Sequence, residues 1–60
     1  MKVQINTEKE YYRRDGLMKG LIVEVEYMGP NFGGGNFYKA IGIDHRYYLT
    51  REDFVVLDNN

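Results

Sequence analysis

The sequence carries few of the side chains that perform chemistry in enzymes. It contains no cysteine, no serine and one histidine, His45. Thr7 and Thr50 have no evident base beside them, so an activated nucleophile is not expected. One histidine without thiolate ligands cannot form a zinc site. These residues predict a protein that is not an enzyme and that binds no metal or cofactor.

Two further patterns resemble functional motifs but have simpler interpretations. Residues 33–35 are consecutive glycines, yet an aromatic segment follows them. A phosphate-binding loop instead continues through a lysine and a hydroxyl residue into a helix. The second pattern is a pair of nearby carboxylates, which in an enzyme could act as acid and base. Glu24 and Glu26 instead fit the solvent-facing side of a strand, and Glu52 and Asp53 fit a capped turn. Neither pattern predicts catalysis.

Aromatic side chains are abundant. Six tyrosines and three phenylalanines occur in 60 residues, more rings than the interior of so small a domain needs. Three doublets occur, at residues 11–12, 37–38 and 47–48. Because neighbouring side chains on a strand point to opposite faces, one ring of each strand doublet is expected outside the core. Such rings either cover a sheet face or form a contact platform.

Phe32 lies within the glycine-rich residues 29–36, where an aromatic ring has little core to reach. Two placements are open for it: folded back over the domain, or projecting as an anchor for a partner's pocket. An exposed aromatic platform favours a protein partner. The residues expected to contact that partner are Phe32, Phe37, Tyr38, Tyr47, Tyr48 and Tyr12.

The charge distribution supports a second interpretation. The net charge is -1, so there is no global attraction to nucleic acid or to an anionic membrane. A local basic face beside the tyrosines would suit single-stranded nucleic acid. Acidic residues lie between the cations in the sequence, so the alternative is an ordinary surface of mixed charge. Protein binding is therefore preferred over nucleic-acid binding. The residues expected to contact nucleic acid in this second interpretation are Arg13, Arg14, Lys39, Arg46 and Arg51.

Short strands would position these residues. Residues 21–28 alternate apolar side chains with Glu24 and Glu26, which is typical of a half-buried strand. Residues 7–14 predict a loop with a helical turn, with Thr7 and Glu10 at capping-box spacing. Residues 50–53 repeat that spacing and predict a 3₁₀ turn. The expected strands are residues 1–6, 21–28, 37–44, 46–50 and 54–57, with a tight turn at 44–45.

Five short strands in 60 residues are typical of a small barrel, and their order resembles an SH3-like barrel. Residues 17–25 are similar to the SH3 leucine and glycine turn that lead into the second strand. Residues 37–40 are similar to the aromatic-aromatic-basic-alanine start of the third strand, and residues 52–55 resemble the 3₁₀ turn. The first strand lacks the SH3 tyrosine motif and no proline precedes the turn, so a proline-rich ligand is not implied.

We therefore expect one all-β domain over residues 1–60, a five-stranded SH3-like barrel with a short 3₁₀ turn before its last strand. It resembles small SH3-like proteins of phages and of Gram-positive bacteria. Small size, surplus aromatic rings, absent catalytic groups and a near-neutral charge favour a phage-encoded inhibitor or adaptor that acts on a host protein. The absence of cysteine fits a reducing compartment. The polar N-terminal segment does not fit a signal peptide, and no apolar run reaches the ~20 residues of a membrane helix. We expect a cytoplasmic protein with no membrane contact.

Three functions stay open at this point. The first is a protein-binding module that uses exposed aromatic rings. The second is a small barrel that binds single-stranded nucleic acid through a basic and tyrosine-rich face. The third is a structural homodimer that pairs through an exposed edge strand.

Overall fold

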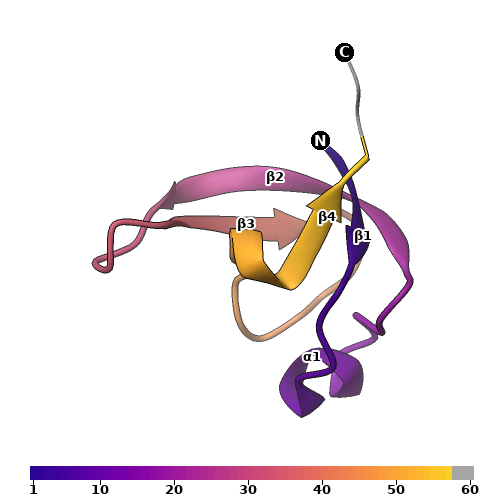
Figure 1. The fold of residues 1–60 in the computed structure, drawn as a ribbon. Helices are drawn as coiled ribbons and strands as arrows, with labels where there is room; N and C mark the ends of the chain where they lie inside the picture. The colour runs from indigo at the N-terminus through magenta and orange to yellow at the C-terminus, as the bar shows by residue number, and fades with distance from the viewer. Residues whose placement is uncertain (58–60) are drawn as a thin grey trace.

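The computed structural model describes residues 1–57, which form one antiparallel four-stranded sheet with the order β3-β2-β1-β4. The four strands are β1 (Lys2–Ile5), β2 (Ile22–Pro30), β3 (Asn36–Ala40) and β4 (Phe54–Val56). One helical turn, α1 (Glu10–Arg14), and one 3₁₀ turn, η1 (Arg51–Asp53), complete the described elements. The expected all-β class is confirmed. Figure 1 shows β2 spanning the molecule, with β3 along one end and β1 at the other.

The long strand β2 serves two partners in turn. Its first half pairs with β1, with Val23 opposite Val3, and its second half pairs with β3, with Tyr27 opposite Tyr38. The register shifts between Tyr27 and Gly29, where Gly29 has a φ of +129°. A glycine tolerates that backbone conformation, so the irregularity has a cause in the sequence.

The core lies on one face of this sheet. Val3 and Ile5 of β1 are fully buried, as the alternation of the first strand predicts. On β2 the alternation also buries Val25, but Tyr27 is 58% exposed because β1 pairs only as far as Glu24. Beyond that point β2 belongs to a projecting hairpin with β3. The buried hydrophobic residues are Val3, Ile5, Tyr12, Leu17, Val25, Tyr38, Ala40, Leu49 and Phe54.

The expected strand over residues 46–50 is not found, and the strand expected over 37–44 ends at Ala40. A single bridge between Tyr38 and Leu49 joins the two segments. The described residues therefore contain four strands in an open sheet. Five strands and a closed barrel are not observed in this part of the chain.

Side chains explain why residues 46–48 do not form a strand. The Arg46 N–H donates to the Asp15 carboxylate at 2.8 Å. The Tyr48 carbonyl oxygen lies 2.8 Å from the Tyr12 hydroxyl. The Tyr47 carbonyl oxygen lies 2.8 Å from Nδ1 of His45. Because these backbone groups already have side-chain partners, a neighbouring strand is not needed to satisfy them.

The two short turns differ in how they are capped. The capping box expected at Thr7 and Glu10 does not form: the N-cap of α1 is Lys9, without a side-chain cap. The expected 3₁₀ turn is confirmed as η1, with a complete capping box between Thr50 and Asp53. Within residues 1–57, no helix has the length and apolar character needed to cross a membrane.

Candidate partner-binding groove

A groove of about 630 Å³ lies where α1, residues 46–50 and the start of β3 meet. We call it the tyrosine groove. Its walls are rich in aromatic rings, and its floor contains a buried carboxylate. The residues that line it are Lys9, Tyr11, Tyr12, Phe37, Arg46, Tyr47, Tyr48, Thr50 and Asp53.

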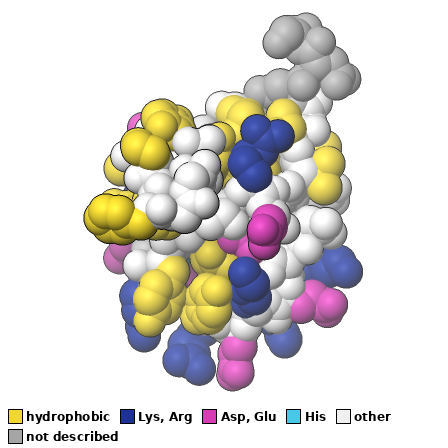
Figure 2. Space-filling model, turned by 60° about the vertical axis from the view of Figure 1, so that its left-hand side comes forward, with side chains coloured by type: hydrophobic (Ala, Val, Ile, Leu, Met, Phe, Trp, Pro, Cys, Tyr) yellow, Lys and Arg dark blue, Asp and Glu magenta, His cyan; other side chains and the backbone are white. Residues whose placement is uncertain are grey.

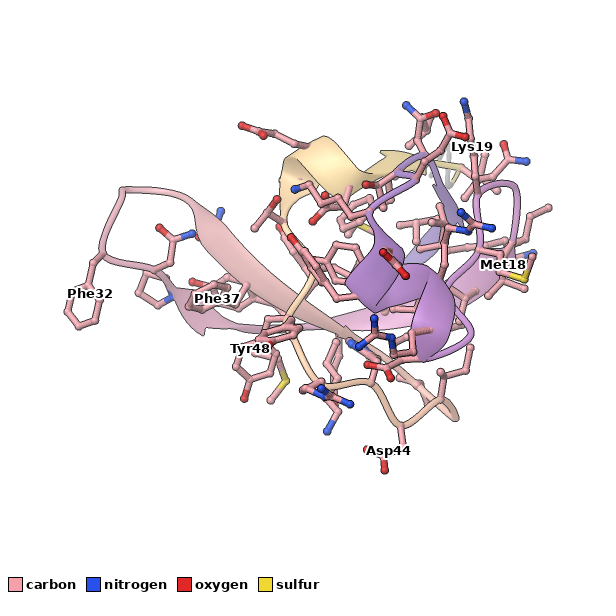
Figure 3. All side chains as sticks on the ribbon, turned by 90° about the horizontal axis from the view of Figure 1, so that it is seen from below. Met18, Lys19, Phe32, Phe37, Asp44 and Tyr48 are labelled. Atoms are coloured by element: carbon pink, nitrogen blue, oxygen red, sulfur yellow. The ribbon has the colours of Figure 1, made fainter. Side chains whose placement is uncertain are left out.

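Two pairs of rings form the aromatic walls. The Tyr11 and Tyr47 ring centroids lie 5.0 Å apart in an edge-to-face arrangement. The Phe37 and Tyr48 centroids lie 5.2 Å apart, and Figure 3 shows these two rings side by side. Tyr11, Tyr47 and Tyr48 are 39%, 50% and 45% exposed. Contacts between rings restrict their motion while leaving apolar surface in solvent, so the groove offers partly ordered aromatic surface.

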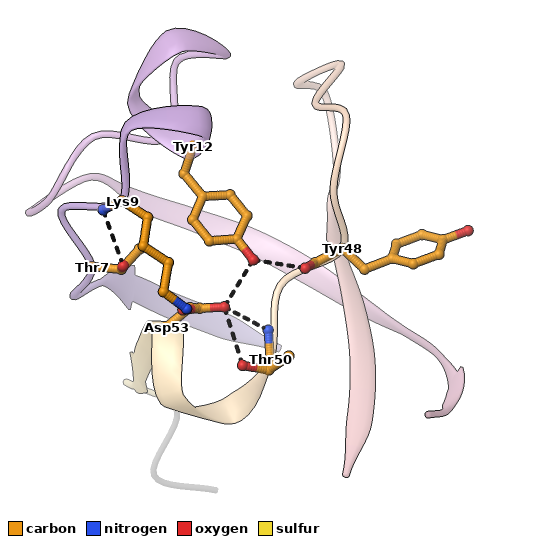
Figure 4. Close-up of polar contacts among 6 residues, drawn as sticks. All are labelled: Thr7, Lys9, Tyr12, Tyr48, Thr50 and Asp53. Atoms are coloured by element: carbon orange, nitrogen blue, oxygen red, sulfur yellow. Dashed lines mark hydrogen bonds and ion pairs between the residues drawn. The ribbon is translucent and has the colours of Figure 1, made fainter. Parts of the chain in front are cut away.

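Asp53 is the centre of a polar network beneath the rings (Figure 4). Its side chain is 1% exposed. Oδ2 accepts hydrogen bonds from the Thr50 N–H at 2.9 Å and from the Thr50 hydroxyl at 3.1 Å. Oδ1 accepts from Nζ of Lys9 at 3.2 Å. Both carboxylate oxygens therefore have donors within the protein.

Tyr12 connects this network to the segment that carries the exposed tyrosines. Its hydroxyl lies 2.9 Å from Oδ2 of Asp53 and 2.8 Å from the Tyr48 carbonyl oxygen. A phenol has one hydrogen, so it donates to one of these acceptors at a time. Either bond ties α1 to residues on the opposite side of the groove. The network thus holds the backbone at Tyr48 in place, and with it the segment that carries the rings of Tyr47 and Tyr48.

The network also favours one protonation state of Tyr12 and of Lys9. Burial, followed by the hydrogen bond and charge of Asp53, raises the pKa of Tyr12 well above its usual range, so the phenol is neutral. The hydrogen bond and charge of Asp53 likewise raise the pKa of Lys9, so its ammonium group is charged at neutral pH. Lys9 is the cation that balances the buried carboxylate.

Each aromatic doublet has one ring or more outside the core. Tyr12 and Tyr38, both expected at the partner surface, are only 3% and 8% exposed. They face the interior because α1 and β3 each turn one side toward the core. Tyr12 lines the floor of the groove, whereas Tyr38 packs against Tyr27 and Phe54 away from the groove lining. Phe37 is half-buried. Tyr47 and Tyr48 are both exposed because their segment is not a strand.

Phe32 projects from the tip of the β2–β3 hairpin and does not fold back over the domain. Its side chain is fully exposed, and Figure 3 shows it pointing away from the labelled Phe37 and Tyr48. Oδ1 of Asn31 accepts hydrogen bonds from the N–H groups of Gly33 and Gly35, at 2.8 and 3.0 Å. These bonds shape the loop without giving the ring a contact surface.

The basic residues expected to bind nucleic acid are distributed over several parts of the surface. Arg46 lines the tyrosine groove. Arg13 and Arg14 line a separate depression, where Arg14 lies 3.5 Å from a carboxylate oxygen of Glu10. Figure 2 shows Lys and Arg side chains as separate spots on this face, with acidic side chains between some of them.

The last two cations are also apart from this groove. Arg51 lines a third depression together with Glu52. Lys39 of β3 lies opposite Glu26 of β2 in the register of the sheet, at the spacing where cross-strand side chains are neighbours. The five cations therefore do not line one common depression.

Sequence reasoning did not identify His45 as a structural residue. Its ring is 7% exposed. Nε2 accepts a hydrogen bond from the Ala40 N–H at 2.9 Å, and Nδ1 donates to the Tyr47 carbonyl oxygen at 2.8 Å. The ring thereby joins the end of β3 to the segment that carries the exposed tyrosines. No local sequence pattern signals these bonds, because both depend on how the chain turns at residues 41–45.

Lys9, Tyr11, Thr50 and Asp53 were also missed as groove residues. The doublet at residues 11–12 and the capping spacing at residues 50–53 were the available signals. No protein-family model, curated protein or solved structure matches the chain. The resemblance to SH3-like barrels therefore stays a prediction from the residues alone.

Proposed function

We propose that this chain is a non-enzymatic module that binds a protein partner through the tyrosine groove. One observation carries the proposal: paired rings of Tyr11, Tyr47, Phe37 and Tyr48 stand outside the core over a floor held by buried hydrogen bonds. Tyrosine is enriched among the residues that dominate protein–protein binding energy. A structured apolar groove also loses little side-chain freedom when it is filled.

The proposal also includes an SH3-like origin of the fold and a cytoplasmic location of the protein. The Tyr38–Leu49 bridge supports a relationship to SH3-like barrels, because it brings Leu49 against the outer edge of β3, where a further strand of a barrel would pair. We propose that the protein acts in the cytoplasm as a small inhibitor or adaptor of the phage type. Its size and surplus of aromatic rings support an action by occupying a partner's surface.

Two other functions are weaker candidates. Single-stranded nucleic acid is favoured by Arg46 beside Tyr47 and Tyr48 in one groove, but such ligands need a row of cations along the backbone. A homodimer is favoured by β4, which has a strand neighbour on one side only. That strand has three residues, a short edge for pairing.

A displayed library of protein fragments selected on the purified chain provides a ligand for the test. The ligand is then titrated calorimetrically against the wild type, a Tyr47→Ala/Tyr48→Ala variant and a Tyr27→Ala control. Tyr27 is an exposed tyrosine outside the groove. We expect a loss of affinity of about 30-fold or more for the double variant, and about twofold or less for the control.

Amide NMR spectra establish whether each variant is folded. A folded double variant that binds as tightly as the wild type would overturn the proposal. Recovery of no fragment that shifts groove resonances would also overturn it. Tighter binding of oligothymidylate than of any fragment, with a steep loss on adding salt, would support nucleic acid instead.

A further inference from the structure

We propose that the tyrosine groove accepts an extended segment of the partner that places an Asp or Glu side chain beside an apolar residue. This rests on the proposed function and adds the chemistry of the ligand. The rings of Tyr11, Tyr47 and Tyr48 supply the apolar contact. The sign of the required charge follows from the ionisable groups that line the groove.

No carboxylate in the groove lining is available to a basic ligand. Asp53 is the one acidic residue among the lining residues, and it is 1% exposed. Donors from Lys9 and Thr50 engage its oxygens, and the Tyr12 hydroxyl lies 2.9 Å from Oδ2. A lysine or arginine of a partner would have to displace these donors. The groove therefore does not favour a cation.

Two cations of the lining face the solvent. Lys9 is 47% exposed although it pairs with Asp53. Arg46 is exposed, and within residues 1–57 its guanidinium group has no carboxylate within ion-pair distance. The Arg46 backbone is held by Asp15, whose carboxylate accepts its N–H at 2.8 Å. A guanidinium group with five donors on an anchored backbone suits a partner carboxylate.

The shape of the surface favours an extended segment. A depression of about 420 Å³ adjoins the tyrosine groove, and the two share Lys9 and Thr50. The depression continues toward the glycine-rich loop, where Gly33 and Gly35 contribute to its lining. A chain lying along both would follow a continuous path, whereas a single side chain would fill only the first. Extended peptides bind along grooves of this kind.

A nucleic acid is the weaker anionic ligand. Its backbone carries a charge on every nucleotide and needs several cations in a row. Arg13 and Arg14 line a different depression, and the net charge of the whole chain is -1. One carboxylate opposite Arg46 matches the local charge without requiring that row.

A displayed library of random short peptides tests the ligand chemistry. It is selected separately on the wild type, on an Arg46→Glu variant and on an Arg13→Glu control, whose exposed cation lies outside the groove. We expect the wild type and the control to enrich peptides with Asp or Glu next to aromatic or aliphatic residues. We expect Arg46→Glu to enrich Lys or Arg at that place, because the sign of the local charge is reversed.

Titration of the best wild-type peptide and of its Glu→Gln or Asp→Asn analogue gives the magnitude. We expect the neutral analogue to bind the wild type about tenfold more weakly than the acidic peptide does. On Arg46→Glu we expect the reverse order, with the neutral analogue binding more tightly than the acidic peptide, because two carboxylates then face each other. Amide NMR shifts show whether each peptide binds in the groove.

The outcomes separate the two proposals. Peptides that bind in the groove without acidic enrichment, or with the same preference on Arg46→Glu, would refute the acidic ligand and leave the protein-binding groove intact. Peptides that bind elsewhere, or no enriched peptide at all, would refute both. Binding of oligothymidylate in the groove in place of peptides would refute the acidic peptide and favour the nucleic-acid function.

Discussion

Beneath the tyrosine groove, Asp53 is 1% exposed, and donors from three residues, Lys9, Tyr12 and Thr50, lie within hydrogen-bond distance of its carboxylate. At the tip of the β2–β3 hairpin, by contrast, Phe32 is fully exposed and the loop is held by one residue, Asn31. The first region buries charge to fix a geometry. The second leaves an apolar ring in solvent on a glycine-rich support.

The comparison shows that the residues beneath the groove stabilise the fold, whereas the exposed rings are available for binding. The floor residues Tyr12 and Asp53 connect α1, η1 and residues 46–50, so a change there alters several segments at once. Phe32, Tyr47 and Tyr48 expose ring surface to solvent. That surface contributes little to the stability of the fold, so it is available to a partner. Substitutions in the two regions are therefore expected to affect different measurements.

Asp53→Ala is expected to give the largest loss of stability. It removes the acceptor from Thr50, from Tyr12 and from Lys9. Leaving such donors without an acceptor costs about 3 kcal/mol. Domains of this size have total stabilities of about 3–9 kcal/mol, so a large fraction of the variant should be unfolded. Urea denaturation followed by circular dichroism measures the change.

Glu52→Ala is the matched control for this prediction. Glu52 is the adjacent carboxylate and is exposed, so its removal should change the unfolding free energy by about 0.5 kcal/mol or less. Equal destabilisation by the two alanine substitutions would show that the network does not stabilise the floor.

Tyr12→Phe is expected to have a smaller effect that depends on pH. At neutral pH the variant loses the hydroxyl contacts with Asp53 and Tyr48, at a cost of about 1 kcal/mol. The pKa of folded Tyr12 is raised above its ordinary value of 10.0. In the wild type, the folded state therefore retains a proton that the unfolded state loses. The stability linked to this proton is complete below pH 10.0 and decreases as the pH rises above it.

The phenylalanine variant has no such proton, so its stability should fall less steeply in alkali. The wild type should lose about 1.4 kcal/mol per pH unit more than the variant, and the two curves should cross about one unit above pH 10. Urea melts between neutral and alkaline pH measure this, with Tyr27→Phe as the exposed control. Parallel curves for the wild type and Tyr12→Phe would mean that the phenol is not held neutral by the network.

The sequence was sufficient for features that depend on local periodicity. The alternation in residues 1–6 and 21–28 predicted β1 and β2, and the spacing of Thr50 and Asp53 predicted the capped 3₁₀ turn. The prediction of a strand over residues 46–50 was wrong because its backbone groups bond to side chains of His45, Tyr12 and Asp15. Partners from distant parts of the chain leave no periodic pattern in the sequence.

The same limit applied to the candidate site. Phe37, Tyr47 and Tyr48 were expected at the partner surface because they belong to aromatic doublets, and the structure brings them to one groove. Tyr11 was not selected over Tyr12, because the choice depends on the phase of one helical turn. The balance of charge in the groove depends on Lys9 and Asp53, which are 44 residues apart in the sequence.

Phe32→Ala is expected to have the smallest effect on stability of the three substitutions. The ring is fully exposed, so its removal should change the unfolding free energy by about 0.5 kcal/mol or less. It should weaken binding of a whole partner protein while leaving the affinity of a short groove peptide unchanged, because the ring points away from Tyr48 (Figure 3). Urea melts and paired titrations with partner and peptide measure the three quantities. A loss of stability of about 1 kcal/mol or more would mean that the ring packs against the domain in solution, and the contrast between hairpin and floor would then be lost.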